Sequence, residues 1–175
     1  MSTPPPPLSA LAVYAHPDDP EVSCGGTLAA WAAAGAEVHV VVCAQGDKGS
    51  SDPTIVPADL ARRRADEMAA ASAALGLSGH LALGRPDGEV ENDAALRSEL
   101  VAVVRRLRPQ VVICPDPTAV LFGSRYFNHR DHRSVGWATL DAVAPAASSP
   151  HYFPDAGPAH QVEAVYLSGT LDPDV

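Results

Sequence analysis

The chain has 175 residues, of which 46% are hydrophobic, and its 12 basic and 21 acidic residues give a formal charge of −9. A chain of this length and hydrophobicity can bury a core within one domain, which excludes an intrinsically disordered protein. The acidic balance argues against nucleic acid or an anionic membrane surface as the main partner.

The two ends of the chain and its cysteines also limit the function. Residues 1–7, with four consecutive prolines, are expected to form a flexible leader ahead of a single domain over 8–175. No signal peptide is recognised, and no apolar run reaches the roughly 18 residues of a membrane helix. Cys24, Cys43 and Cys114 form no close pair, which favours a reducing, cytoplasmic location.

Apolar runs typical of β-strands alternate with helical patterns along the chain. Strands are predicted at 8–15, 36–44, 80–83, 110–115 and 162–168, and helices at 24–34, 57–75, 93–107 and 129–143. The run 38–42 is almost entirely valine, which is typical of a strand covered on both faces. The alternation predicts a Rossmann-like α/β fold, with a mainly parallel sheet and helices on both faces in three layers.

The first predicted strand is followed by the segment HPDDPE, residues 16–21. Ligands of parallel α/β sheets bind at the carboxyl ends of the strands, so this position favours a functional site. His16 and Asp18 are two residues apart in an extended segment and project to the same side. Asp19, which precedes Pro20, has the pattern of a helix N-cap as well as that of a metal ligand, and the two interpretations stay balanced here.

A second cluster, His129, Asp131 and His132, follows the fourth predicted strand and its long loop. On a helix His129 and His132 share a face, and Asp131 could orient one of the imidazoles. Two histidines and a carboxylate are a common ligand set of catalytic zinc, and a further carboxylate nearby could act as general base. The alternative is a solvated helix start with Asn128 as its cap.

Two other functions fit the same residue types. The arrangement His16-x-Asp18 with His132 is also that of a non-haem iron oxygenase, although the predicted α/β pattern disagrees with the jelly roll usual for that spacing. A non-catalytic metal- or ligand-binding module on the same scaffold is the stronger competitor. Its glycine loop would be Gly25–Gly26, which lacks the G-x-G-x-x-G spacing.

The segments AHPDDPE, CGGTLA and HRDH together resemble the LmbE-like, or PIG-L, family of metal-dependent N-deacetylases, over about residues 8–171. The resemblance implies a zinc enzyme, with ferrous iron as the alternative, that removes an acetyl group from an N-acetylated amino sugar of the GlcNAc type or a related small amide. It implies His16, Asp19 and His132 as metal ligands. It also implies Asp18 as the general base that takes a proton from the metal-activated water.

The resemblance assigns further residues around this centre. His129 is expected to stabilise the oxyanion or protonate the leaving amine, and Asp131 to hold His129 or His132 in place. Three substrate contacts are expected from Asp47, Arg64 and Asp87, although Arg64 also fits a solvated helix face and Asp87 an ordinary Pro-Asp-Gly turn.

The family's pattern is not matched everywhere. Some relatives have a tyrosine where this chain has Phe127, with Tyr126 beside it. The chain stops soon after the fifth predicted strand where family members continue, so it is expected to be a small member or a truncated form. The expected partner is a small N-acetylated sugar, and a homo-oligomer is compatible with the sequence.

Overall fold

The computed structural model describes residues 5–123 and 125–174, so most of the predicted proline leader lies outside the described residues. Its main elements, in chain order, are β1 (Ser9–Tyr14), α1 (Asp19–Ala33), β2 (Glu37–Ala44), α2 (Pro57–Ala74), β3 (Gly79–Arg85), α3 (Ala94–Leu107), β4 (Val111–Pro115), β5 (Leu121–Phe122), β6 (Tyr126–Phe127), α4 (Arg130–Asp141) and β7 (Ala164–Ser168). A π-helical segment, Ala142–Ala147, and a 3-10 turn, Pro154–Ala156, lie between α4 and β7.

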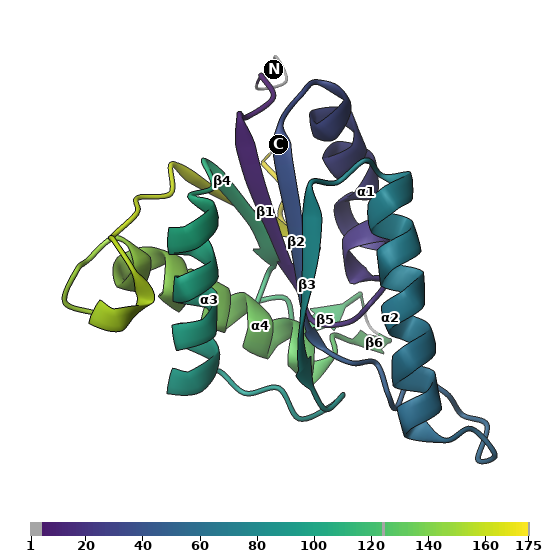
Figure 1. The fold of residues 1–175 in the computed structure, drawn as a ribbon. Coiled ribbons are helices and arrows are strands. Elements are labelled where there is room, and N and C mark those ends of the chain that lie inside the picture. Colours follow the sequence, from purple (N-terminus) through teal and green to yellow (C-terminus); the bar gives the residue numbers. More distant parts are fainter. Residues whose placement is uncertain (1–4, 124, 175) are drawn as a thin grey trace.

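Five strands form a parallel sheet in the order β3-β2-β1-β4-β7, and β5 and β6 form a separate antiparallel pair. Helices α1 and α2 cover one face of the sheet, and α3 and α4 cover the other (Figure 1). This arrangement confirms the predicted Rossmann-like α/β fold with three layers. The order of the first four strands places the switch in direction between β1 and β4, where ligands of such sheets bind.

The sheet separates two hydrophobic cores because successive residues of a strand face opposite sides. Leu11, Val13 and Val41 point toward α3 and α4, whereas Ala12, Val40 and Val42 point toward α1. The strands in the middle of the sheet are therefore apolar over most of their length, as the run 38–42 predicts. The carboxyl ends of β1, β2 and β4 meet at one edge, where HPDDPE and the loop before α4 also lie (Figure 1).

The five predicted strands are all present, with shifts of one or two residues at most of their ends. The prediction for the first helix was wrong at its start, since α1 begins at Asp19 and not at residue 24. Pro20 fits the first turn of a helix because that turn does not need its missing N–H group. The pair β5–β6 was not predicted, because two-residue strands carry no measurable periodicity.

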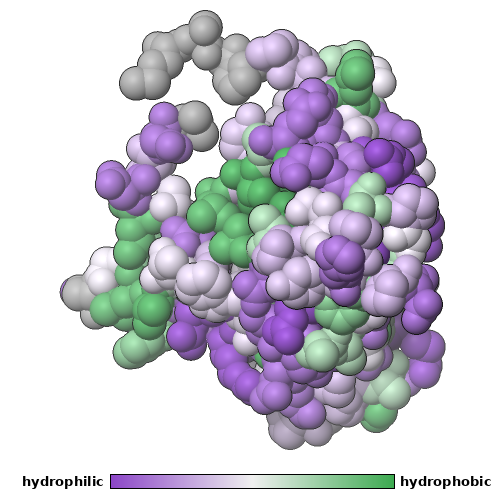
Figure 2. Space-filling model, turned by 90° about the vertical axis from the view of Figure 1, so that its left-hand side faces the viewer, coloured by the Kyte–Doolittle hydropathy of each residue, from purple (hydrophilic) through white to green (hydrophobic). Residues whose placement is uncertain are grey.

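The surface is mostly polar, with exposed hydrophobic side chains in a few places. On the face shown in Figure 2, the hydrophobic residues gather mainly in the left half. The most exposed large hydrophobic side chains include Val22, Phe127 and Leu171. Among the described residues no helix combines the length and the apolar character required to span a membrane.

Candidate metal centre and active site

The loop between β1 and α1 places His16, Asp18 and Asp19 at the carboxyl edge of the sheet. Asp18 occupies the position before the first residue of α1, and no side chain caps this helix. The Asp19 carboxylate instead accepts the backbone N–H of His16 at 2.8 Å. The structure therefore does not support the interpretation of Asp19 as a helix cap. The Asp19 carboxylate lies beside the His16 ring, 3.4 Å from Nδ1.

The start of α4 brings the second cluster to the same place. His129, not Asn128, is the N-cap residue, and its Nδ1 accepts the backbone N–H of Asp131 at 3.3 Å. The buried Asn128 donates its amide to the Ala119 carbonyl at 2.7 Å, which orients the amide so that its oxygen lies 2.9 Å from His132 Nδ1. His132 Nδ1 is then the protonated nitrogen, and the lone pair of Nε2 is directed away from Asn128.

Two imidazole nitrogens and the Asp19 carboxylate converge at the centre of this edge. His132 Nε2 lies 3.2 Å from His16 Nδ1 and 3.2 Å from Asp19 Oδ1, and the other Asp19 oxygen, Oδ2, lies 3.4 Å from His16 Nδ1. Ligand atoms of a tetrahedral zinc site with bonds of about 2.0–2.1 Å lie roughly 3.3–3.4 Å apart. The donor types and the 3.2 Å between the two imidazole nitrogens therefore suit a metal ion at His16 and His132, with an Asp19 oxygen beside each ring. His129 also lies close enough to join His16 and His132 as a ligand, and His16, Asp87, His129 and Asp131 form a second possible group.

The other nitrogen of His16 faces two more carboxylates. Nε2 lies 3.1 Å from Asp87 and 3.5 Å from Asp131. Asp131 is fully buried and also accepts the backbone N–H groups of Gly88, at 2.7 Å, and Val90, at 3.3 Å. The Asp131 carboxylate thus lies against His16, while its backbone N–H contacts His129 Nδ1 at 3.3 Å. The expectation that Asp131 holds His129 or His132 in place stays a prediction.

The carboxylates around His16 change its protonation. Burial alone would lower the pKa of His16, but its hydrogen bonds to Asp131 and Asp19 outweigh burial and raise the pKa to about 10. The surroundings of His16 therefore favour a positive charge on or beside its ring at neutral pH. His129 differs, because burial and the nearby His16 and His132 lower its pKa, and its ring is neutral at pH 7.

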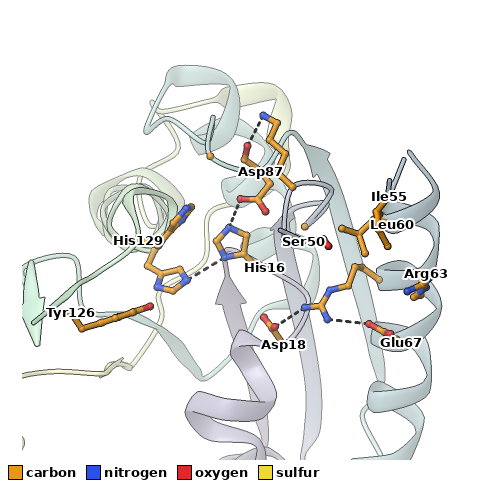
Figure 3. A pocket seen from close by; sticks show the side chains of 16 residues that line it. His16, Asp18, Ser50, Ile55, Leu60, Arg63, Glu67, Asp87, Tyr126 and His129 are labelled. Atoms are coloured by element: carbon orange, nitrogen blue, oxygen red, sulfur yellow. Dashed lines mark hydrogen bonds and ion pairs between the residues drawn. The ribbon is translucent and has the colours of Figure 1, made fainter. Parts of the chain in front are cut away.

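His16 and His132 form one wall of a cavity of about 700 Å³, together with Asp18, Asp87 and His129. In Figure 3 the His16 ring points from the end of β1 toward Asp87. Arg64 donates to the Asp18 carboxylate at 2.6 Å and to Glu67 at 3.1 Å. Asp18 keeps 56% of its side chain exposed, so it remains accessible from the cavity.

The three residues predicted to bind substrate lie differently from one another. Arg64 and Asp87 both line the cavity, whereas Asp47 is absent from its lining among the described residues. The Asp47 carboxylate accepts the backbone N–H of Asp87 at 2.8 Å and so holds the loop that carries Asp87. Lys48, which the sequence analysis did not single out, also lines the cavity and donates to the Asp87 carbonyl at 2.7 Å.

The short pair β5–β6 determines which of the two neighbouring aromatic residues, Tyr126 or Phe127, lines the cavity. Tyr126 lines the cavity, and in Figure 3 its ring points toward the space beside His129. Phe127 is 75% exposed, because adjacent residues of a strand point to opposite faces. Tyr126 is therefore placed to donate its hydroxyl into the cavity. Neither Tyr126 nor Asn128 could be assigned from the sequence, where no periodic pattern marks them.

The chain is similar to proteins of known name in sequence and in structure. It is 32% identical to the 1D-myo-inositol 2-acetamido-2-deoxy-alpha-D-glucopyranoside deacetylase of Rhodococcus jostii, over 91% of this chain and 61% of that protein. The N,N'-diacetylchitobiose deacetylase of Pyrococcus horikoshii superposes with a TM-score of 0.88 at 26% identity, over 96% of this chain and 62% of the other. The chain thus spans about three fifths of the length of these proteins.

Not all similar structures are deacetylases. GalB, the 4-carboxy-2-hydroxymuconate hydratase of Pseudomonas putida, matches with a TM-score of 0.76 at 26% identity, over 91% of this chain and 64% of the other. The family model described as GlcNAc-PI de-N-acetylase, PIG-L, matches residues 11–143, which contain both His/Asp clusters. The chain therefore belongs to the PIG-L family.

Proposed function

We propose that the chain is a zinc-dependent hydrolase that removes the acetyl group from an N-acetylated amino sugar of the GlcNAc type. The observation that carries the proposal is the convergence of His16, Asp19 and His132 at 3.2–3.4 Å on the wall of an open cavity. The deacetylase names of its relatives support the same reaction. Ferrous iron fits the same three ligands and is the alternative ion.

A zinc ion held by these three side chains would polarise the amide carbonyl and favour the ionisation of water. Asp18 acts as the general base, because its carboxylate is exposed next to the ligand Asp19 and opens to the cavity. Arg64 fixes that carboxylate through its 2.6 Å contact, so that one oxygen is directed to the reacting water. The proton that Asp18 accepts is available for the departing amine.

The negative charge that develops on the amide carbonyl oxygen during hydrolysis needs hydrogen-bond donors on the side of the cavity away from Asp18. His129 is neutral, and because its Nδ1 accepts from the backbone of Asp131, its Nε2 carries the proton. Tyr126 lies beside His129 on the same wall. We assign His129 Nε2–H and the Tyr126 hydroxyl as donors to the oxyanion. Asp131 acts indirectly, through His16 and the backbone of the neighbouring loop.

The wall opposite Tyr126 is suited to a sugar. Arg64, Lys48 and Asp87 offer charged donors and an acceptor, which are the partners that sugar hydroxyls require. Asp47 supports this wall through the backbone of Asp87 and does not contact the substrate.

The three cysteines are unpaired, which supports the prediction of a reducing, cytoplasmic location.

The test combines metal analysis with the release of acetate from N-acetylglucosamine and its conjugates. The purified chain is expected to bind one zinc ion and to release acetate and free amine in equal amounts. Asp18→Asn should keep the zinc and lose at least 100-fold in turnover, which is the usual contribution of a general base. His132→Ala should lose both the zinc and the turnover.

Two results would contradict the proposal. Zinc binding without acetate release from any amide would leave the non-catalytic module, or a hydratase such as GalB, as the better function. Unchanged turnover in both variants would show that the centre described here is not the active site.

A further inference from the structure

A second cavity lies on the other side of the candidate metal centre. It has a volume of about 360 Å³ and is lined by residues that include Asp19, Val22 and Ser23 from α1, Pro115 from β4, and Phe122 from β5. His132 lines both cavities, whereas His16 lines only the first and Asp19 only the second, so the three proposed metal ligands lie between the two. An amide held at the centre would therefore have one cavity on each side of its C–N bond.

Several polar groups around the second cavity, those of Tyr14, Ser168 and Asn128, already have partners. The Tyr14 hydroxyl donates to Ser168 Oγ at 2.8 Å, and Ser168 in turn contacts the Cys114 carbonyl at 3.4 Å. The Asn128 amide is used by Ala119 and His132. Because these groups are satisfied, most of the wall offers carbon to a ligand, from Val22, Pro115, Phe122 and the ring of Tyr14.

The first cavity has the opposite character. It carries Lys48, Arg63, Arg64 and Asp87, and Arg63 makes no ion pair or side-chain hydrogen bond among the described residues. A polyhydroxylated amine is suited to this side, which leaves the apolar side for the acyl group. An acetyl methyl group would fill only a small part of about 360 Å³, since one water molecule occupies about 30 Å³ in the liquid.

We propose that the second cavity is an acyl-binding site that accepts linear N-acyl chains longer than acetyl, such as butyryl and hexanoyl. The inference rests on the proposed function and names a broader substrate class for the same centre. Each added methylene that is buried in the cavity is expected to lower the dissociation constant by up to about fourfold, because transferring a methylene from water to an apolar site is favourable by about 0.8 kcal/mol. Preference for hexanoyl over acetyl could thus exceed tenfold.

The test uses two N-acylglucosamines, acetyl and hexanoyl, with the zinc-loaded chain. Release of free amine gives kcat/KM for each substrate, and calorimetric titration of the Asp18→Asn variant gives each dissociation constant without hydrolysis. The hexanoyl compound is expected to bind at least tenfold more tightly and to have the higher kcat/KM. Weaker hexanoyl binding with normal acetate release would overturn the acyl site and leave the deacetylase proposal intact.

Two matched variants locate the effect. Ser23→Phe places a ring in the second cavity from an exposed position of α1, and is expected to lower the hexanoyl-to-acetyl ratio of kcat/KM at least tenfold. Ala30→Phe adds the same group to an exposed position of the same helix that lines neither cavity, and should leave the ratio unchanged.

The calorimetric measurement stays informative without turnover. The same comparison by binding uses each variant combined with Asp18→Asn. Tight hexanoyl binding that is sensitive to Ser23→Phe, without amide hydrolysis, would support the acyl site and count against the hydrolase. An equal response of the ratio to Ser23→Phe and Ala30→Phe would overturn the assignment of the cavity.

Discussion

A chain of two hydrogen bonds orients His132 at the proposed metal centre. The Ala119 carbonyl orients the Asn128 amide, and the Asn128 oxygen accepts from His132 Nδ1 at 2.9 Å. His16 is held in a similar way by Asp87 and Asp131. Each histidine therefore presents one defined nitrogen to the centre, because its other nitrogen is occupied by an oxygen acceptor.

Asn128→Ala tests this role without removing a ligand. His132 loses the acceptor that selects its tautomer and ring orientation, so the dissociation constant for zinc is expected to rise 10- to 100-fold. The measurement is a competitive titration of zinc against a chromophoric chelator. Asn92→Ala is the control, since Asn92 bonds to Asp141 and Arg97 away from both cavities, and its zinc affinity should not change.

Helix α4 carries Asp131 and His132, with His129 as its N-cap, and packs directly on the end of β4. At Gly136 a Cβ atom would lie only 2.4 Å from the Pro115 carbonyl oxygen and 3.0 Å from two carbons of Pro117. The helix can approach β4 this closely only because the residue has no side chain. The position of His132, one turn earlier on α4, depends on that approach.

Gly136→Ala is therefore expected to move α4 away from β4. The free energy of unfolding should fall by at least about 1–3 kcal/mol, as overpacking of a core contact does, and zinc affinity should fall with it. Urea denaturation measures the first quantity and chelator competition the second. Gly26→Ala on α1 has nothing within 4 Å of the new Cβ, and there the helix should become about 0.5–1 kcal/mol more stable. Equal behaviour of the two variants would contradict the packing argument.

Arg105 joins α3 to the segment between α4 and β7. Its side chain is 3% exposed and donates to six backbone carbonyls, which belong to Ala146, Ala147, Ser149, Tyr152, Phe153 and Gly157. Three of these carbonyls, those of Ala147, Ser149 and Phe153, also accept one backbone N–H each. One arginine thus ties together carbonyl oxygens along an irregular segment of the chain.

Arg105→Met removes these donors and keeps the apolar stem. The free energy of unfolding is expected to fall by several kcal/mol, similar to the ~3–5 kcal/mol cost of breaking a buried charge pair, and residues 146–157 should become a site of limited proteolysis. Arg106→Met is the control, because Arg106 lies next to Arg105 but is exposed, and its replacement removes the same charge. Cleavage at the same rate in both variants would show that Arg105 does not hold the segment.

The sequence predicts those elements well that have a long, uniform pattern. The valines at 38–42 and the leucines and valines of α3 mark a strand and a helix within one or two residues. The start of α1 was missed because Asp19–Ser23 are mostly polar or small and carry no apolar stripe. Periodicity needs several turns or strand residues, and these five positions do not provide them.

In the candidate site, too, the sequence predicts local motifs but not the contacts between residues that are far apart in the chain. The two His/Asp clusters are visible as motifs, and the parallel fold predicts that both lie at the same edge of the sheet. The contact between Asp87 and His16 joins residues 71 positions apart through the conformation of two loops, so no local pattern predicts it. Asn128 is likewise an ordinary loop residue until β5, β6 and α4 are in place.

At the scale of the whole molecule, the buried cysteines connect the packing of the hydrophobic cores to the dependence of stability on pH. Cys43 on β2 and Cys114 on β4 are fully buried, and burial raises the pKa of each thiol to about 12. Cys24, near the Tyr14 hydroxyl, has its pKa raised by burial to about 11. In an unfolded chain the same thiols ionise near a pKa of about 8.5.

This difference predicts how stability depends on pH. Between about pH 8.5 and 12 the unfolded state holds fewer thiol protons than the folded state, so rising pH favours unfolding. The contribution is fully present below pH 8.5 and is lost progressively above it, by up to about 1.4 kcal/mol per pH unit for each buried thiol. Urea denaturation at pH 8 and pH 10 measures the loss. A Cys43→Ala, Cys114→Ala variant should show a flatter profile, because two of the thiols no longer titrate. The same slope in both proteins would mean that other groups, and not these thiols, control alkaline unfolding.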